Sequence, residues 1–307
     1  MALQFVFGGS GSGKSHYLYQ RIIQEAGEHP ALNYMVLVPE QFTMQTQKDL
    51  VLMNEKKGIM NIDVLSFGRL AYRIFEETGK GNTPVLDDEG KNLILRKIAG
   101  DIEPELRVLK GNMKRLGYIS EVKSVLSEFD QYDIGGEELD RVMKRAGEES
   151  YLYYKLQDMS LIYKKFREYL RDRYITKEEI LDVLCRTVPE SELLKRSVVV
   201  LDGFTGFTPV QNRLLAELMK LARDVIVTVT IDDREDPYRY TDACQMFGMS
   251  KHTVTTLTRI ARECGVEQTE PVWLKKRPFY RFRKSEALAF LEEHLFRYSG
   301  RYYIGKP

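Results

Sequence analysis

The first eighty residues alternate between short apolar runs and stretches whose apolar residues recur at helical spacing. The apolar runs are residues 3–7, 33–39 and 62–67. Because they are short and mostly continuous, these runs are typical of strands buried on both faces of a parallel sheet. The stretches between them predict helices at residues 16–26, from about residue 42, and at residues 69–78. Three successive strand-then-helix units predict an α/β fold, with a parallel sheet covered by helices.

A different pattern begins at residue 87 and continues to about residue 187. This region is rich in Glu, Lys, Arg and Leu, and apolar residues such as Ile119, Val122 and Leu126 recur at helical spacing. It predicts an all-helical insertion of about five helices. Apolar strand-like runs then return at residues 197–202 and 225–231, so the chain is expected to re-enter the sheet after the insertion.

A glycine-rich loop follows the first predicted strand directly. Residues 8–15 read Gly-Gly-Ser-Gly-Ser-Gly-Lys-Ser, which matches the phosphate-binding P-loop pattern G-x-x-x-x-G-K-[ST]. Its glycines allow successive backbone N–H groups to turn inward around phosphate oxygens. In such a loop Lys14 reaches the β- and γ-phosphates, the Ser15 hydroxyl ligates Mg²⁺, and the following helix directs its positive end at the phosphates.

Asp202 ends the apolar run that follows the helical region. In P-loop proteins, an acid at the carboxyl end of such a strand is expected near the Mg²⁺ that the P-loop hydroxyl holds. Hydrolytic relatives of the helicase type carry a Glu after this acid as general base, whereas this chain has Gly203. Binding of ATP–Mg²⁺ is therefore better supported than its hydrolysis. The predicted nucleotide-binding residues are Gly8, Gly9, Ser10, Gly11, Ser12, Gly13, Lys14, Ser15 and Asp202, with Ser15 and Asp202 on the metal.

Together these patterns predict two domains. Residues 1–86 and 188–307 would form a discontinuous P-loop domain, and residues 87–187 a helical domain inserted into it. The 46 basic and 45 acidic residues leave a formal net charge of +1, so contact with nucleic acid would have to come from local patches. Cysteine spacing indicates neither a disulfide framework nor a metal site, and no run resembles a signal peptide or a membrane span. A cytoplasmic protein without a membrane partner is expected.

A basic and aromatic stretch near the end of the chain allows two interpretations. Residues 273–284 contain six basic residues and four aromatic ones. This composition suits phosphate neutralisation combined with base stacking. It equally suits a solvated charged edge whose aromatic rings pack inward, and the sequence does not decide between the two.

Four segments in order resemble one family. They are the P-loop, Val-Pro-Glu-Gln-Phe-Thr at residues 38–43, Val-Leu-Ser-Phe-Gly-Arg-Leu-Ala at residues 64–71, and residues 201–211 with Leu-Asp-Gly-Phe and Phe-Thr-Pro-Val-Gln. Together they resemble the N-terminal part of the B subunit of AddAB-type ATP-dependent helicase–nucleases, and more distantly the first motor domain of UvrD-like superfamily 1 helicases. The resemblance implies a RecA-like P-loop fold with a helical insertion. It also implies a subunit of an enzyme that processes double-strand DNA ends in repair by homologous recombination.

The same resemblance implies partners and cofactors. The partners are the A subunit, in a heterodimer, and DNA as single strands and duplex ends; the cofactors are ATP and Mg²⁺. Family members carry a 4Fe–4S cluster only in a C-terminal nuclease region that these residues lack. The B subunit is a degenerate motor that scans for the Chi signal, which agrees with Gly203 and with little or no hydrolysis by this chain alone. The implied contacts to single-stranded DNA are Gln41, Phe42, Ser66, Phe67 and Arg69.

Two alternatives remain open on the residues alone. The chain could be a free-standing P-loop ATPase or kinase with a helical lid, which would require an acceptor site and measurable turnover. It could also be a structural scaffold in which the P-loop is a relic, which would bind no nucleotide while it still binds a partner protein.

Overall fold

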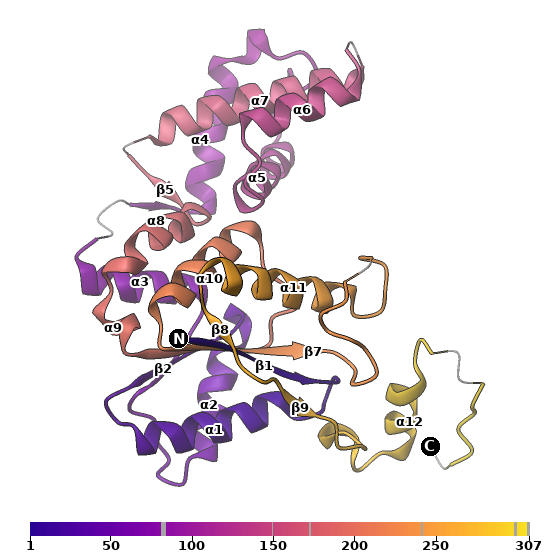
Figure 1. The fold of residues 1–307 in the computed structure, drawn as a ribbon. Helices are drawn as coiled ribbons and strands as arrows, with labels where there is room; N and C mark the ends of the chain where they lie inside the picture. The colour runs from indigo at the N-terminus through magenta and orange to yellow at the C-terminus, as the bar shows by residue number, and fades with distance from the viewer. Residues whose placement is uncertain (81–83, 149, 172, 241, 298–299, 306–307) are drawn as a thin grey trace. The chain divides into compact units, whose positions relative to one another are not determined.

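The computed structural model describes residues 1–307 except 81–83, 149, 172, 241, 298–299 and 306–307. The chain forms two compact units (Figure 1). The first, here called the sheet unit, comprises Met1–Glu77, Val188–Phe207 and Leu215–Pro307. The second, the helical unit, comprises Thr78–Thr187 and Thr208–Leu214.

A seven-stranded sheet forms the centre of the sheet unit. Its hydrogen-bonded order is β3-β2-β6-β7-β1-β8, and β9 also pairs with β1. Every strand pair in this sheet is parallel. The strands are β1 Ala2–Gly8, β2 Asn33–Leu37, β3 Ile62–Leu65, β6 Ser197–Leu201, β7 Asp224–Thr230, β8 Glu267–Gln268 and β9 Val272–Leu274. The predicted α/β class with a parallel sheet is thereby confirmed.

Helices cover the two faces of this sheet. On one face, α1 Lys14–Glu28 and α2 Thr43–Met53 pack through Leu18, Ile22 and Leu50 onto strand residues such as Val36 and Val200. On the other face lie α11 Gly248–Glu263 and the second half of α10 Pro209–Leu221 (Figure 1). The central strands are buried from both sides, which explains why their sequences read as continuous apolar runs rather than as an alternation.

The order of the strands explains which helix covers which face. The connections from β1 through α1 to β2, and through α2 to β3, step in one direction across the sheet; those from β6 through α10 to β7, and through α11 to β8, step back. Because such crossovers are right-handed, opposite directions place their helices on opposite faces. The carboxyl ends of all these strands share one edge of the sheet, where ligands of α/β proteins bind.

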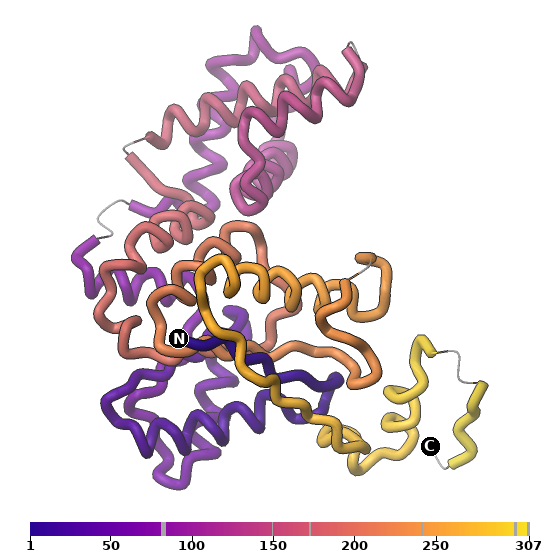
Figure 2. The backbone as a smooth tube through the Cα atoms, viewed as in Figure 1, coloured from indigo at the N-terminus to yellow at the C-terminus, as the bar shows by residue number. Residues whose placement is uncertain are grey.

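The chain ends of the sheet unit meet beside the P-loop strand. Residues Val6 to Gly8 pair with Val272 to Leu274 of β9, so the first and last parts of the sheet lie side by side (Figure 2). Beyond β9 come a 3₁₀ turn, η5 Tyr280–Phe282, and helix α12 Glu286–His294. The sequence predicted neither β8 nor β9, because strands of two or three residues carry little periodic signal.

The remaining elements of the sheet unit are short or follow the prediction closely. Helix α3 Phe67–Thr78 buries Leu70, Ile74 and Phe75, as its pattern predicted. The others are the 3₁₀ turns η1 Glu40–Phe42 and η4 Val188–Glu190, and helix α9 Glu192–Lys195.

The helical unit has its own apolar core. Among its described residues the α-helices within residues 87–187 are α4 Asp88–Asp101, α5 Leu116–Gln131, α6 Gly136–Ala146, α7 Tyr151–Leu170 and α8 Glu179–Thr187. Leu95, Ile119, Leu126, Ile162 and Phe166 lie at the centre of the core. The strands β4 Val85–Leu86 and β5 Ile175–Thr176 form a separate parallel pair, and short 3₁₀ turns, Glu103–Glu105 and Asn112–Lys114, join α4 to α5. The assignment of the two predicted domains to parts of a motor stays a prediction.

Buried polar groups order the loops of the helical unit. The Asp158 carboxylate is 2% exposed and accepts hydrogen bonds at 2.8–3.1 Å from the backbone N–H groups of Arg107, Val108 and Leu109. The buried Lys91 ammonium lies 2.6 Å from a Glu178 carboxylate oxygen. Within the part of the chain that the structure describes, no helix is long and apolar enough to cross a membrane.

Candidate functional site

The predicted P-loop connects β1 to α1 at the carboxyl edge of the sheet. Strand β1 ends at Gly8, and helix α1 begins at Lys14. Gly11 and Gly13 have φ angles of 78° and 97°, in the left-handed region that favours glycine. The turn is closed by a hydrogen bond of 3.2 Å from the Ser12 N–H to the Gly9 carbonyl. Helix α1 therefore begins two residues earlier than the periodicity predicted, directly under the loop.

The Lys14 ammonium folds back over the loop. It donates hydrogen bonds of 3.0 Å to the carbonyl oxygens of both Gly8 and Gly9. Burial lowers the pKa of Lys14 to about 8; the Asp202 carboxylate opposes this shift, and the Arg281 guanidinium adds to it. A lysine in these surroundings is poorly compensated, which is the electrostatic condition that a bound anion relieves.

Asp202 follows β6 and is held on both carboxylate oxygens. Its side chain is 4% exposed. The Thr228 hydroxyl donates to Oδ1 at 2.6 Å, and the Tyr19 hydroxyl donates to Oδ2 at 2.8 Å. Tyr19 also lies 3.3 Å from the Thr46 hydroxyl. Burial, with the Asp202 charge second, raises the pKa of Tyr19 far above its usual value, so its hydroxyl stays a donor.

The P-loop and Asp202 together border a cavity of about 310 Å³. Six of the nine predicted nucleotide-binding residues line it: Ser10, Gly11, Gly13, Lys14, Ser15 and Asp202. Gly8, Gly9 and Ser12 are not among its lining residues; the first two instead present their carbonyls to Lys14. The structure therefore brings together two segments that are far apart in the sequence.

Residues 279–281 cover the P-loop from the C-terminal side. Phe279 is 3% exposed, and a Cβ on Gly9 would fall 2.2 Å from its ring, so only glycine fits there. The Arg281 N–H donates to the Gly11 carbonyl at 3.0 Å. The Tyr280 ring stacks on His16, with centroids 5.4 Å apart. Tyr280 and Arg281 also line the cavity.

The sequence did not identify these two residues as part of the nucleotide cavity. They belong to the stretch 273–284, whose mixture of basic and aromatic residues was the available signal, although it does not reveal a position beside the P-loop. Tyr19 and Thr228 were also missed, because they are 183 and 26 residues from Asp202 and form no sequence pattern with it.

The residues predicted to contact DNA follow β2 and β3 at the same edge of the sheet. Phe42, in η1, is 48% exposed, and Gln41 and Arg69 are also exposed. Ser66 and Phe67 are each 7% exposed, and the Phe67 ring lies 5.3 Å from the Phe204 ring, centroid to centroid. The exposed three are accessible to a ligand and the buried two support the loop, while contact with DNA stays a prediction.

The predicted metal ligands have the chemistry that Mg²⁺ requires. A hydroxyl and a carboxylate, from Ser15 and Asp202, line the same cavity, and Mg²⁺ in nucleotide sites is held by one or two such oxygens together with phosphates and water. Among the described residues no group of three or more His, Cys, Asp or Glu could hold a metal by itself. The pair therefore fits a metal that arrives with the nucleotide.

The family model described as "ADDB, N-terminal" matches residues 5–292, and the chain therefore belongs to the AddB N-terminal family. This confirms the resemblance found in the sequence. Among curated relatives, the B subunit of the ATP-dependent helicase/deoxyribonuclease of Lachnoclostridium phytofermentans is 45% identical over 301 residues, which cover 97% of this chain and 26% of the relative.

Proteins with the same name show the same coverage. The relative from Thermoanaerobacter sp. strain X514 is 35% identical over 99% of this chain and 26% of its own length. The relative from Clostridium kluyveri is 33% identical, also over 99% of this chain and 26% of its own length. The chain thus spans about a quarter of the curated relatives it matches.

Proposed function

We propose that this chain is the nucleotide-binding N-terminal part of the B subunit of an ATP-dependent helicase–deoxyribonuclease. The observation that carries the proposal is the cavity in which Lys14, Ser15 and Asp202 meet. A P-loop followed by a helix and faced by a buried acid is suited to a nucleoside triphosphate with Mg²⁺. The parallel sheet, with these groups at its carboxyl edge, supports a RecA-like P-loop fold.

Nucleotide binding would use groups that are already positioned. The inward backbone N–H groups of the loop and the first turn of α1 would bind phosphate oxygens. The Lys14 ammonium would exchange the Gly8 and Gly9 carbonyls for phosphate oxygens, which form stronger, charge-assisted hydrogen bonds. Arg281 would add a second cation at the cavity. Mg²⁺, bound with the nucleotide, would neutralise phosphate charge and be held by Ser15 and Asp202.

The cavity does not favour hydrolysis. Asp202 is the only carboxylate among its described lining residues, and the hydroxyls of Tyr19 and Thr228 already occupy both of its oxygens. Gly203, where a general base would be expected, is exposed, with a φ of 78°. We therefore infer a degenerate motor that binds ATP with little or no turnover.

The wider role follows from the family. In the complete heterodimer with the A subunit, this part would contact single-stranded DNA through the loops at Gln41, Phe42, Ser66, Phe67 and Arg69. It would take part in processing duplex ends and in scanning for Chi during recombinational repair in the cytoplasm. Exposed Phe42 offers a stacking surface and Arg69 a phosphate contact.

Titration calorimetry with ATP–Mg²⁺, with and without single-stranded DNA, tests the proposal. Wild-type chain should bind, and Lys14→Ala should weaken binding by about 100-fold, because a charge-assisted phosphate contact in a half-buried site is lost. Lys48→Ala, on the exposed face of α2, is the matched control and should bind as wild type. Unchanged affinity in Lys14→Ala would refute the assignment.

A phosphate-release assay on the same samples separates the alternatives. Binding without release supports the degenerate motor. Steady release by the chain alone would favour a free-standing ATPase, and absence of binding by any nucleotide would favour a scaffold with a relic site.

A further inference from the structure

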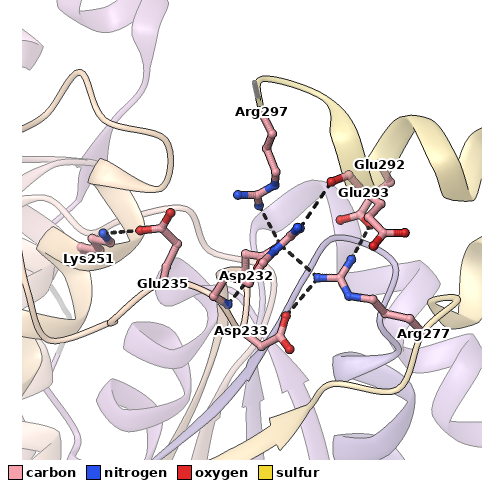
Figure 3. A network of polar contacts seen from close by, with 9 residues as sticks. Asp232, Asp233, Glu235, Lys251, Arg277, Glu292, Glu293 and Arg297 are labelled. Carbon is pink, nitrogen blue, oxygen red and sulfur yellow. Dashed lines mark hydrogen bonds and ion pairs between the residues drawn. The ribbon is translucent and has the colours of Figure 1, made fainter. Parts of the chain in front are cut away.

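A second buried carboxylate lies at the carboxyl edge of the sheet, outside the nucleotide cavity. Asp232 comes just after β7 and is 1% exposed. Its oxygens accept hydrogen bonds from three arginines (Figure 3). Arg234 contacts Oδ1 at 2.8 Å and Oδ2 at 2.9 Å. Oδ2 also accepts from Arg277 at 3.1 Å and from Arg297 at 2.7 Å.

Two of these arginines belong to the segment that follows β9. Arg277 and Arg297 stand at either end of residues 277–297, here called the C-terminal segment, which includes η5 and α12. Additional contacts join the same parts. Arg277 lies 3.0 Å from Asp233 and 3.5 Å from Glu292, and Arg234 donates to the Glu293 carbonyl at 3.4 Å (Figure 3). The C-terminal segment is therefore attached at both ends to the loop after β7.

The attachment lies close to the residues that cover the P-loop. Arg277 precedes Phe279 by two residues, and its guanidinium lies 4.7 Å from the centroid of the Phe279 ring. Phe279 in turn packs against Gly9, and the next two residues line the nucleotide cavity. A continuous set of contacts thus runs from Asp232 through Arg277 and Phe279 to the P-loop.

The charge of Asp232 depends on these partners. Burial alone would raise its pKa, but the hydrogen bonds from Arg234 and the charges of Arg297 and Arg277 hold the pKa well below its usual range. A buried carboxylate that loses its charge leaves several guanidinium groups without compensation, and such broken networks are strongly unfavourable. The docked position of the C-terminal segment is therefore sensitive to this one carboxylate.

We propose that Asp232 is a positioning residue that docks the C-terminal segment and thereby holds Tyr280 and Arg281 at the nucleotide cavity. The inference rests on the proposed nucleotide binding but concerns a residue that does not line the cavity. Without Asp232 the segment would undock, and the cavity would lose one cation and one aromatic ring. The nucleotide would then bind a conformation that only a fraction of molecules adopt.

The test compares Asp232→Asn with the wild-type chain. The variant keeps the shape of the side chain and removes its charge. If the segment remains docked in about one molecule in ten, the apparent Kd for ATP–Mg²⁺ in calorimetry rises about tenfold. Hydrogen exchange supplies an independent readout, because the Arg281 N–H is bonded to Gly11 and the Phe282 N–H to Phe279. Exchange at these two amides should accelerate about tenfold.

Asp236→Asn is the matched control. Asp236 lies in the same loop, and its carboxylate accepts from the Tyr238 N–H at 2.9 Å, a bond that the asparagine carbonyl can keep. Affinity and exchange should both remain at wild-type values. If Asp232→Asn does not fold, Arg277→Gln removes the network from its half-exposed side. If both variants fold, their double variant should be no weaker than either single one, because both act through the same docking.

The outcomes separate the two proposals. Faster exchange in Asp232→Asn with unchanged affinity would overturn the link to the nucleotide, and unchanged exchange would overturn the docking role. If the wild-type chain binds no nucleotide, the proposed function fails, whereas the exchange measurement still decides whether Asp232 docks the C-terminal segment.

Discussion

Replacing Tyr19 by Phe removes one hydroxyl from the site and leaves the ring packed between α1 and the sheet. That hydroxyl donates to Asp202 at 2.8 Å and lies 3.3 Å from the Thr46 hydroxyl. Tyr19 is 5% exposed and Asp202 4% exposed, so water cannot readily replace the lost donor. We expect the sheet unit of Tyr19→Phe to be less stable than that of the wild type.

The size of the loss follows from the charge on the acceptor. A hydrogen bond to a charged group contributes about 1.5–3 kcal/mol, and the weaker contact to Thr46 adds little because both hydroxyls can turn to other acceptors. Asp202 keeps its bond from Thr228, so the carboxylate is only partly unsatisfied. We therefore expect the free energy of unfolding to fall by about 2 kcal/mol.

Urea unfolding followed by tryptophan fluorescence measures this loss. Trp273 is the only tryptophan of the chain; it lies on β9, with its ring 4.8 Å from that of Phe7, and reports on the sheet unit. Tyr17→Phe is the control, since the Tyr17 hydroxyl makes no hydrogen bond to the described residues, and its effect should stay within about 0.5 kcal/mol. If Tyr19→Phe loses no more stability than Tyr17→Phe, the hydroxyl does not support Asp202.

Two further predictions concern a titrating group and a buried loop anchor. The folded-state pKa of Lys14 is lowered to about 8 from 10.5, so between these values the unfolded chain binds more protons. Stability from this group should rise with pH across that window, by at most about 1.4 kcal/mol per pH unit; the difference between wild type and Lys14→Met in urea midpoints should show the rise, and a flat difference would contradict it. In the helical unit, Asp158→Asn should cost about 2–4 kcal/mol in thermal unfolding followed by circular dichroism, because one carboxylate receives three backbone N–H groups. Exposed Asp140→Asn is its control, and equal melting of the two variants would show that the bonds do not anchor the loop.

The fold could be predicted where its signal was local. Apolar runs at residues 33–39 and 197–202 became β2 and β6, and the face formed by Leu70, Ile74 and Phe75 became the buried side of α3. The pairing order was not predictable in the same way, because strand periodicity does not say which strand lies next to which. The β8 and β9 strands were missed since their burial depends on β1, which is more than 250 residues away.

The candidate site was predictable only as far as its motifs reached. Glycine spacing and the Lys-Ser pair mark the P-loop, and an apolar strand ending in an acid marks Asp202. The hydroxyls that hold Asp202 and the aromatic residues that cover Gly9 have no fixed spacing from those motifs. They were found only after folding had brought α1, β7 and the C-terminal segment to the same edge.

The two buried carboxylates at this edge show how their partners can separate their roles. Asp202 receives neutral hydroxyl donors from Tyr19 and Thr228, which orient the carboxylate and leave its negative charge in place. Asp232 receives three guanidinium groups, which more than balance its charge. A carboxylate surrounded by neutral donors can still attract a divalent cation, whereas one surrounded by arginines cannot. The difference in partners therefore favours Asp202 as the metal-side acid and Asp232 as a docking point, although both follow adjacent strands of the same parallel sheet.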